Sequence, residues 1–139
     1  MILDDLAAKP AGLKPADMLA IQLDDHSRFL ERWKDMLKSL LDEGALQGQP
    51  RRSELARVLG GWSGEASVSD PAYRLVRSWR EEVERRTFAA LVAPARRANP
   101  GFAFRAPASF EGPLWVLVNE RPAHLLPSGS VDWRSFLLS

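Results

Sequence analysis

The sequence predicts a mainly α-helical protein that forms a single domain. Two long segments, residues 15–43 and 71–92, carry apolar residues at three- and four-residue spacing, which is the periodicity of a helix with one buried face. Pro and Gly stand at the ends of these segments and not within them, as expected for helix boundaries. About half of the residues fall in predicted helices, more than the third that is typical of globular proteins.

The first long helix is predicted over residues 15–43. Pro15 suits the first turn, where a missing N–H costs nothing, and the next residue that favours a helix end is Gly44. One apolar stripe should face a core. Its members are Met18, Leu19, Gln22, His26, Phe29, Leu30, Trp33, Met36, Leu37, Leu40 and Leu41.

A linker and a short helix are predicted next. Residues 47–50 read as a linker, and residues 53–59 as a helix that Gly60 and Gly61 terminate. Trp62, Ser63 and Gly64 then form a turn.

The second long helix should start at Pro71 and end near Val92. Asp70 can cap it, because its carboxylate accepts hydrogen bonds from the first free N–H groups. Its predicted core stripe is Ala72, Leu75, Val76, Trp79, Val83, Thr87 and Leu91. Its predicted exposed face, laced with salt bridges, is Arg74, Arg77, Arg80, Glu81, Glu84 and Arg85.

The last third of the chain begins with an irregular segment. Prolines at 94, 100, 107 and 113 make residues 95–112 a Pro-rich connection, and Phe102, Phe104 and Phe110 should hold it to the surface. Residues 114–118 form an apolar run that favours a helix, with a buried strand as the alternative. Residues 131–139 begin a helix without a terminating glycine, as if the chain were cut from a longer one.

Composition excludes several classes of function. The 19 basic and 18 acidic residues nearly balance, so nucleic acid is not an expected partner. Residues 1–50 are net −3 and residues 51–139 net +4. The chain has no cysteine, which rules out disulfides and thiolate metal sites. No apolar stretch predicts a membrane span or a signal peptide.

Catalytic, cofactor-binding and metal-binding residues are not predicted in this chain. His26 and His124 are its two histidines, and each lacks the nearby ligands of a zinc site. Asp25, His26 and Ser27 adjoin in sequence, but neighbours on a helix do not face one another, so they are no catalytic triad. We expect His26 to pair across a helix interface, and Asp24 and Asp25 to be solvated helix charges.

The order of several motifs resembles that of the penicillin acylase family. Residues 14–24 (KPADMLAIQLD) are similar to the family's helix with a Met and an Ile-Gln-x-Asp pattern. Residues 62–67 (WSGEAS), followed by 73–76 (YRLV) and Trp79-Arg80, resemble its Trp-x-Gly turn and next helix. Residues 111–115 (EGPLW), 120–127 (ERPAHLLP) and 132–133 (DW) resemble its later β-subunit segments.

This resemblance implies a part of an N-terminal nucleophile hydrolase, cleaved from a precursor into α and β chains. In such enzymes the β-chain's N-terminal Ser attacks an amide carbonyl, its own amine acts as the base, and an Asn helps to hold the oxyanion. The chain departs from this pattern, because position 1 is Met followed by Ile2. The two asparagines, Asn99 and Asn119, lie in unrelated segments, so no catalytic residue is carried over.

We therefore expect a helical subdomain, residues 1–139, cut from the β-chain of a larger αββα hydrolase. Its expected partners are the remaining α-chain and β-chain sandwich, and the parent's substrates would be side-chain amides of penicillins, related β-lactams or acyl-homoserine lactones. Calcium is often bound in the family, so it is expected in the parent and not in this segment. The parent would be periplasmic or secreted.

The alternative hypothesis is a free-standing helical interaction module. Its partner-binding surface would consist of Trp62, Trp115, Phe136 and Leu137. Trp62, Trp115 and Trp133 are near predicted turns, so the sequence allows each to be core or interface. A large exposed apolar patch would suit both hypotheses, because a segment cut from a bigger protein also uncovers its former interface. The native context of the chain therefore distinguishes them, and its surface chemistry does not.

Overall fold

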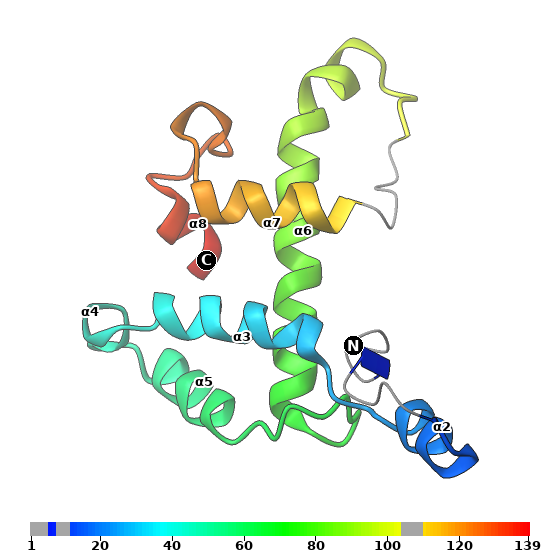
Figure 1. Cartoon of the computed structure of the whole chain (residues 1–139). Helices are drawn as coiled ribbons and strands as arrows, with labels where there is room; N and C mark the ends of the chain where they lie inside the picture. Colours follow the sequence, from blue (N-terminus) through cyan, green and yellow to red (C-terminus); the bar gives the residue numbers. More distant parts are fainter. Residues whose placement is uncertain (1–5, 8–11, 104–109) are drawn as a thin grey trace. The chain divides into compact units, whose positions relative to one another are not determined.

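The computed structural model describes residues 6–7, 12–103 and 110–139, and every regular element named in it is a helix. The mainly α class is therefore confirmed. The chain divides into two compact units, Met1–Arg77 and Ser78–Ser139, and helix α6 (Pro71–Ala98) supplies residues to both (Figure 1). Among the described residues, no helix is long and apolar enough to cross a membrane.

The first predicted long helix is two helices, so that prediction is wrong. Helix α2 covers Pro15–Gln22 and α3 covers Arg28–Leu40. The residues between them are non-helical because their backbone groups bind residues 64–66, as Ser27 N–H does by donating to Gly64 O at 2.8 Å. A tertiary contact thus overrides a sequence that contains no helix breaker.

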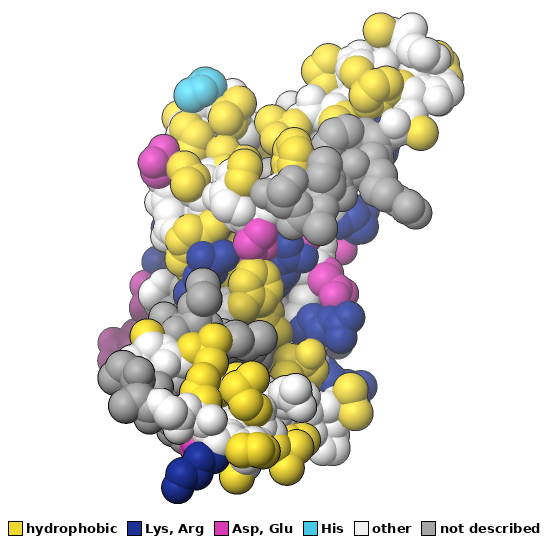
Figure 2. Space-filling model, turned by 45° about the vertical axis from the view of Figure 1, so that its right-hand side comes forward, with side chains coloured by type: hydrophobic (Ala, Val, Ile, Leu, Met, Phe, Trp, Pro, Cys, Tyr) yellow, Lys and Arg dark blue, Asp and Glu magenta, His cyan; other side chains and the backbone are white. Residues whose placement is uncertain are grey.

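The predicted stripe is a core on α3 and not on α2. Leu30, Trp33, Met36, Leu37 and Leu40 are buried, whereas α2 buries no residue. Leu19 is 55% exposed and Phe29 is 45% exposed. Hydrophobic side chains reach the surface in Figure 2.

Two shorter helices complete the first unit. Helix α4 (Glu43–Leu46) is a single turn that Asp42 caps by accepting from Ala45 N–H at 2.9 Å. Helix α5 (Pro50–Gly60) contacts both α3 and α4 and buries Leu59. The predicted short helix is confirmed, but it begins at Pro50, because proline's fixed backbone angle suits the first helical position.

Helix α6 begins where the sequence predicts and ends later. The carboxylate of Asp70 accepts from Ala72 N–H at 2.7 Å and from Tyr73 N–H at 3.2 Å. The helix continues through Pro94 to Ala98, so the predicted end near Val92 is wrong. The φ angle of proline is itself helical. Pro94 therefore costs the helix one backbone hydrogen bond and a steric clash with the carbonyl four residues before it. Of the predicted irregular connection, residues 104–109 lie outside the described part of the chain.

The predicted stripe of α6 is largely confirmed. Ala72, Val76, Val83 and Thr87 are buried, while Leu75 and Leu91 are each about two-fifths exposed. The predicted exposed charged face is wrong at Arg80, whose side chain is 18% exposed. Arg80 pairs with Glu84 and, at 2.6 Å, with Glu111.

The second unit is built from α6 after Arg77 and two further helices. Helix α7 (Glu111–Glu120) confirms the helical reading of residues 114–118, and Phe88 of α6 packs edge-on against Phe110 at 5.2 Å between centroids. A short 3₁₀ helix, η2 (Ala123–Leu125), leads to α8 (Trp133–Leu138). Trp133, Phe136 and Leu137 of α8 are buried.

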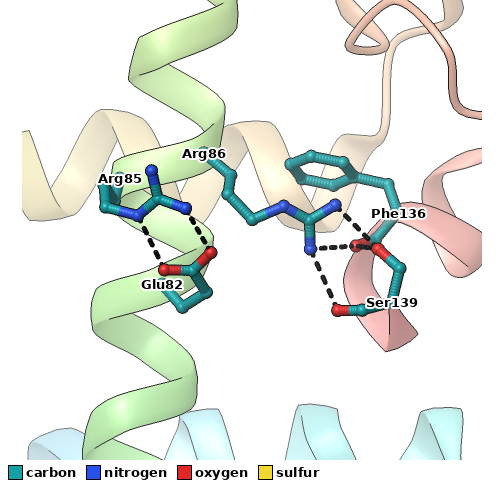
Figure 3. A network of polar contacts seen from close by, with 5 residues as sticks. All are labelled: Glu82, Arg85, Arg86, Phe136 and Ser139. Carbon is teal, nitrogen blue, oxygen red and sulfur yellow. Dashed lines mark hydrogen bonds and ion pairs between the residues drawn. The ribbon is translucent and has the colours of Figure 1, made fainter.

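Helix α8 is held at both ends. Asp132 caps its start by accepting from Ser135 N–H at 2.6 Å. At its end, the Arg86 guanidinium donates to the carbonyls of Phe136 and Ser139 at 3.0 and 3.1 Å and stacks 4.4 Å above the Phe136 ring (Figure 3). Arg86 therefore satisfies the carbonyls that a helix leaves unpaired at its C-terminus.

Candidate functional site

The most distinctive local geometry of the first unit is the pairing of residues 24–27 with residues 64–66. Ser27 N–H donates to Gly64 O and Ala66 N–H donates to Asp25 O, both at 2.8 Å. His26 and Glu65 form an antiparallel bridge between these hydrogen bonds. The pairing satisfies backbone groups that a continuous helix would otherwise bond internally.

Trp62 anchors the turn that supplies this pairing. Its indole is 8% exposed, and its Nε1–H donates to Glu65 O at 2.8 Å. Lys34 Nζ lies 5.1 Å from the centroid of the ring, within the range of a cation–π interaction. The predicted turn at residues 62–64 is confirmed, and Trp62 belongs to the core.

Gly64 is the residue that this turn requires. Its φ is +94°, a conformation that side-chain-bearing residues rarely adopt. A Cβ at this position would lie 3.2 Å from Glu31 Oε1 and 3.5 Å from His26 Cδ2. The lack of a side chain therefore lets residues 24–27 approach closely.

His26 lies between α2 and α3, so its predicted position in a helical core stripe is wrong. Its side chain is 53% exposed, and Nδ1 lies 3.2 Å from Asp24 Oδ1. The same oxygen accepts from the His26 backbone N–H at 3.1 Å. This backbone hydrogen bond is the main cause that lowers the pKa of Asp24, with the nearby imidazole and Arg28 adding to it.

Asp24, Asp25 and His26 form the one group of three metal-ligating side chains found within the described residues. Their ligand atoms lie within 4.8 Å of one another. Three donors fall short of the four in a structural zinc site and of the six to eight oxygens around calcium. Asp24 and Asp25 also lie outside the helices, contrary to the prediction that they are helix charges.

A polar hollow of about 460 Å³ lies beside the same turn. It is lined by Arg57, Val58, Gly61, Ser63, Glu65, Ser67, Ser69, Asp70 and Pro71. Ser67 and Ser69 share a hydrogen bond of 2.7 Å, and Arg57 is engaged by Glu54. The lining offers hydrogen bonds and charges of both signs but contains no histidine to activate a serine.

The remaining sequence candidates are His124, Asn99 and Asn119, and the two asparagines form local hydrogen bonds. His124 is exposed on η2. Asn99 Oδ1 accepts from Gly101 N–H at 3.0 Å, and Asn119 Nδ2 donates to Trp115 O at 3.2 Å. The first bond lies within a turn, and the second joins two residues of helix α7.

The sequence analysis missed the pairing of residues 24–27 with 64–66. One signal was available, because Asp24, Asp25, His26 and Ser27 are consecutive residues of below-average helix propensity. The Trp-x-Gly turn at residues 62–64 leads into the other side of this pairing. Nothing in the spacing of the two segments, about forty residues apart, indicated that they meet.

Comparison with known proteins identifies one family. The family model described as penicillin amidase matches residues 1–133, which is nearly the whole chain. No curated protein and no solved structure matches. The match spans both units, and with them the pairing and the hollow beside Trp62.

Proposed function

The chain belongs to the penicillin amidase family, and from this membership we propose that it is a structural helical part of an acylase-type amidase. In this proposal the segment comes from the β-chain and supports the catalytic sandwich. The nucleophile, its base and the oxyanion donors belong to other parts of the parent polypeptide. The family match over residues 1–133 is the observation that carries the proposal.

The bonds of the serine hydroxyls support a structural role. Ser39 and Ser53 donate to the helix carbonyls of Met36 and Gln49, while Ser67 and Ser69 bind each other. A nucleophilic serine needs a base within hydrogen-bond reach. His26 instead pairs with Asp24.

The proposed reaction of the parent is hydrolysis of a side-chain amide, as in penicillins, related β-lactams or acyl-homoserine lactones. Attack by an N-terminal serine on the amide carbonyl would give an acyl-enzyme, which water then hydrolyses. The proposal assigns no organic cofactor to this segment. A calcium ion, if the parent holds one, would be bound elsewhere.

The alternative, a free-standing interaction module, loses the surface that was expected to bind its partner. Trp62, Phe136 and Leu137 are at most 8% exposed. Buried side chains cannot be the hot spots of a partner-binding surface unless the unit opens. This burial removes the surface that was proposed for the module, and the native context of the chain distinguishes the two hypotheses.

An amide-hydrolysis assay tests the proposal. The native protein that contains this chain would be purified and incubated with chromogenic amides of aromatic and of aliphatic acids, beside the 139-residue chain alone. We expect the native protein to release the chromophore and the chain alone to be inactive. Hydrolysis by the chain alone would refute a purely structural role, and inactivity of the native protein toward every amide would refute the amidase assignment.

A further inference from the structure

The break between α2 and α3 is held by contacts from outside the segment. From Pro15 to Leu41 the sequence contains no second proline and no glycine, so nothing in the chain itself forbids one continuous helix. The break instead coincides with the pairing of residues 24–27 with the turn at residues 62–66. The conformation of the segment therefore depends on where that turn lies.

The broken and the continuous forms of the segment make different hydrogen bonds. The broken form has the bonds to Gly64 O and from Ala66 N–H, and the Asp24 carboxylate accepts from His26 N–H. A continuous helix would replace them with bonds from each residue to the fourth residue before it. Asp and His favour a helix less than Leu or Ala does, so neither form is strongly preferred by the segment alone.

Helix α2 buries none of its side chains among the described residues. Leu19 and Leu23 are 55% and 70% exposed. An isolated helix of eight residues is marginal in water. Extension from α3 would give α2 the cooperative support of a longer helix.

We propose that residues 23–27 form a conformational switch. The segment stays non-helical while the 62–66 turn is paired with it, and becomes helical when the turn withdraws, so that α2 and α3 join into one helix. Trp62 and Gly64 are positioning residues in this device. The Trp62 indole fixes the carbonyl of Glu65, and Gly64 adopts the positive φ of +94° that the turn requires.

Substitution of Gly64 tests the switch in the full chain. Gly64→Ala and Gly64→Val both place a side chain at φ +94° and against His26. Gly60→Ala is the matched control, because its new Cβ meets no atom within 4 Å. The readout is the backbone ¹³Cα secondary shifts of residues 23–27 together with amide exchange at Ser27 and Ala66.

The expected result is that both Gly64 variants lose amide protection at Ala66 and gain helical shifts across residues 23–27, while Gly60→Ala changes neither. A second pair, Asp25→Ala and Asp25→Gly, applies if the Gly64 variants fail to fold. Both remove the same exposed carboxylate, and their helix propensities differ enough to change the helical-to-broken ratio about fivefold in favour of Ala. Non-helical shifts at residues 23–27 in every folded Gly64 variant and equally in both Asp25 variants would overturn the switch.

Discussion

At the scale of single residues, a helix cap and a buried hydroxyl affect stability in opposite directions. Asp70 starts α6 with two hydrogen bonds from its carboxylate. Thr87 lies in the core of the second unit at 1% exposure, and its Oγ1 has no hydrogen-bond partner within the described residues. The first feature stabilises the fold and the second opposes it.

Replacement of Asp70 by Ala should lower the free energy of unfolding by about 1 kcal/mol, because the first N–H groups of α6 lose their acceptor. Urea unfolding followed by circular dichroism measures the change. Asp70→Asn is the control, since an asparagine oxygen also caps helices well. Equal losses for Ala and Asn would show that the cap is not the cause.

Replacement of Thr87 by Val should raise the free energy of unfolding by about 1 kcal/mol, because the shape is kept while an unpaired buried hydroxyl is removed. Thr87→Ser should lower it by a similar amount, since it keeps the hydroxyl and removes a buried methyl group. Thermal unfolding of the two variants beside the original chain provides the comparison. A less stable Val variant would mean that the hydroxyl has a bonding partner in solution.

At the scale of elements, the sequence predicts helix positions well and helix interruptions poorly. The start of α6 follows from Asp70, and the helical nature of α7 from an apolar run. The sequence did not predict the break at residues 23–27 or the continuation of α6 through Pro94. Capping and periodicity are properties of neighbouring residues, whereas the break depends on a turn about forty residues away.

Helix α8 should lose its cap in acid. The backbone N–H of Ser135 binds the ionised carboxylate of Asp132 and lowers its pKa. A lowered pKa in the folded state means that the stabilisation is complete above the unfolded pKa and is lost as pH falls through the folded value. Below about pH 4, the Ser135 amide should lose protection, measured as its exchange rate relative to the intrinsic rate at the same pH. Asp132→Asn, which caps without titrating, should remove this acid dependence, and an unchanged pH profile in that variant would contradict the assignment.

The C-terminal end of α8 should depend on Arg86 and not on its neighbour. Arg86→Ala removes the bonds to Phe136 and Ser139 and should lower the free energy of unfolding by about 1–2 kcal/mol, after allowance for partial exposure. Arg85→Ala, which breaks only the exposed ion pair with Glu82, is the matched control and should leave the unfolding midpoint unchanged. The reverse order of the two effects would contradict the role given to Arg86.

At the scale of the whole molecule, sequence motifs identified the family, and the structure accounts for what those motifs do. The Trp-x-Gly motif is the turn that pairs with residues 24–27, and the closing Asp132-Trp133 is a helix cap followed by a core residue. The Ile-Gln-x-Asp motif ends at Asp24, inside the break. The Trp-x-Gly and Asp-Trp motifs therefore both support the fold.

The size and N-terminal residue of the native polypeptide test that role most directly. The polypeptide that contains residues 66–70 (ASVSD) would be isolated from its source, and its intact mass and first residue determined by mass spectrometry and N-terminal sequencing. We predict a chain several-fold heavier than 15.5 kDa that begins with a free serine, as an amidase β-chain does. A native chain of about this mass that begins Met1-Ile2 would contradict the proposal and favour a separate helical protein.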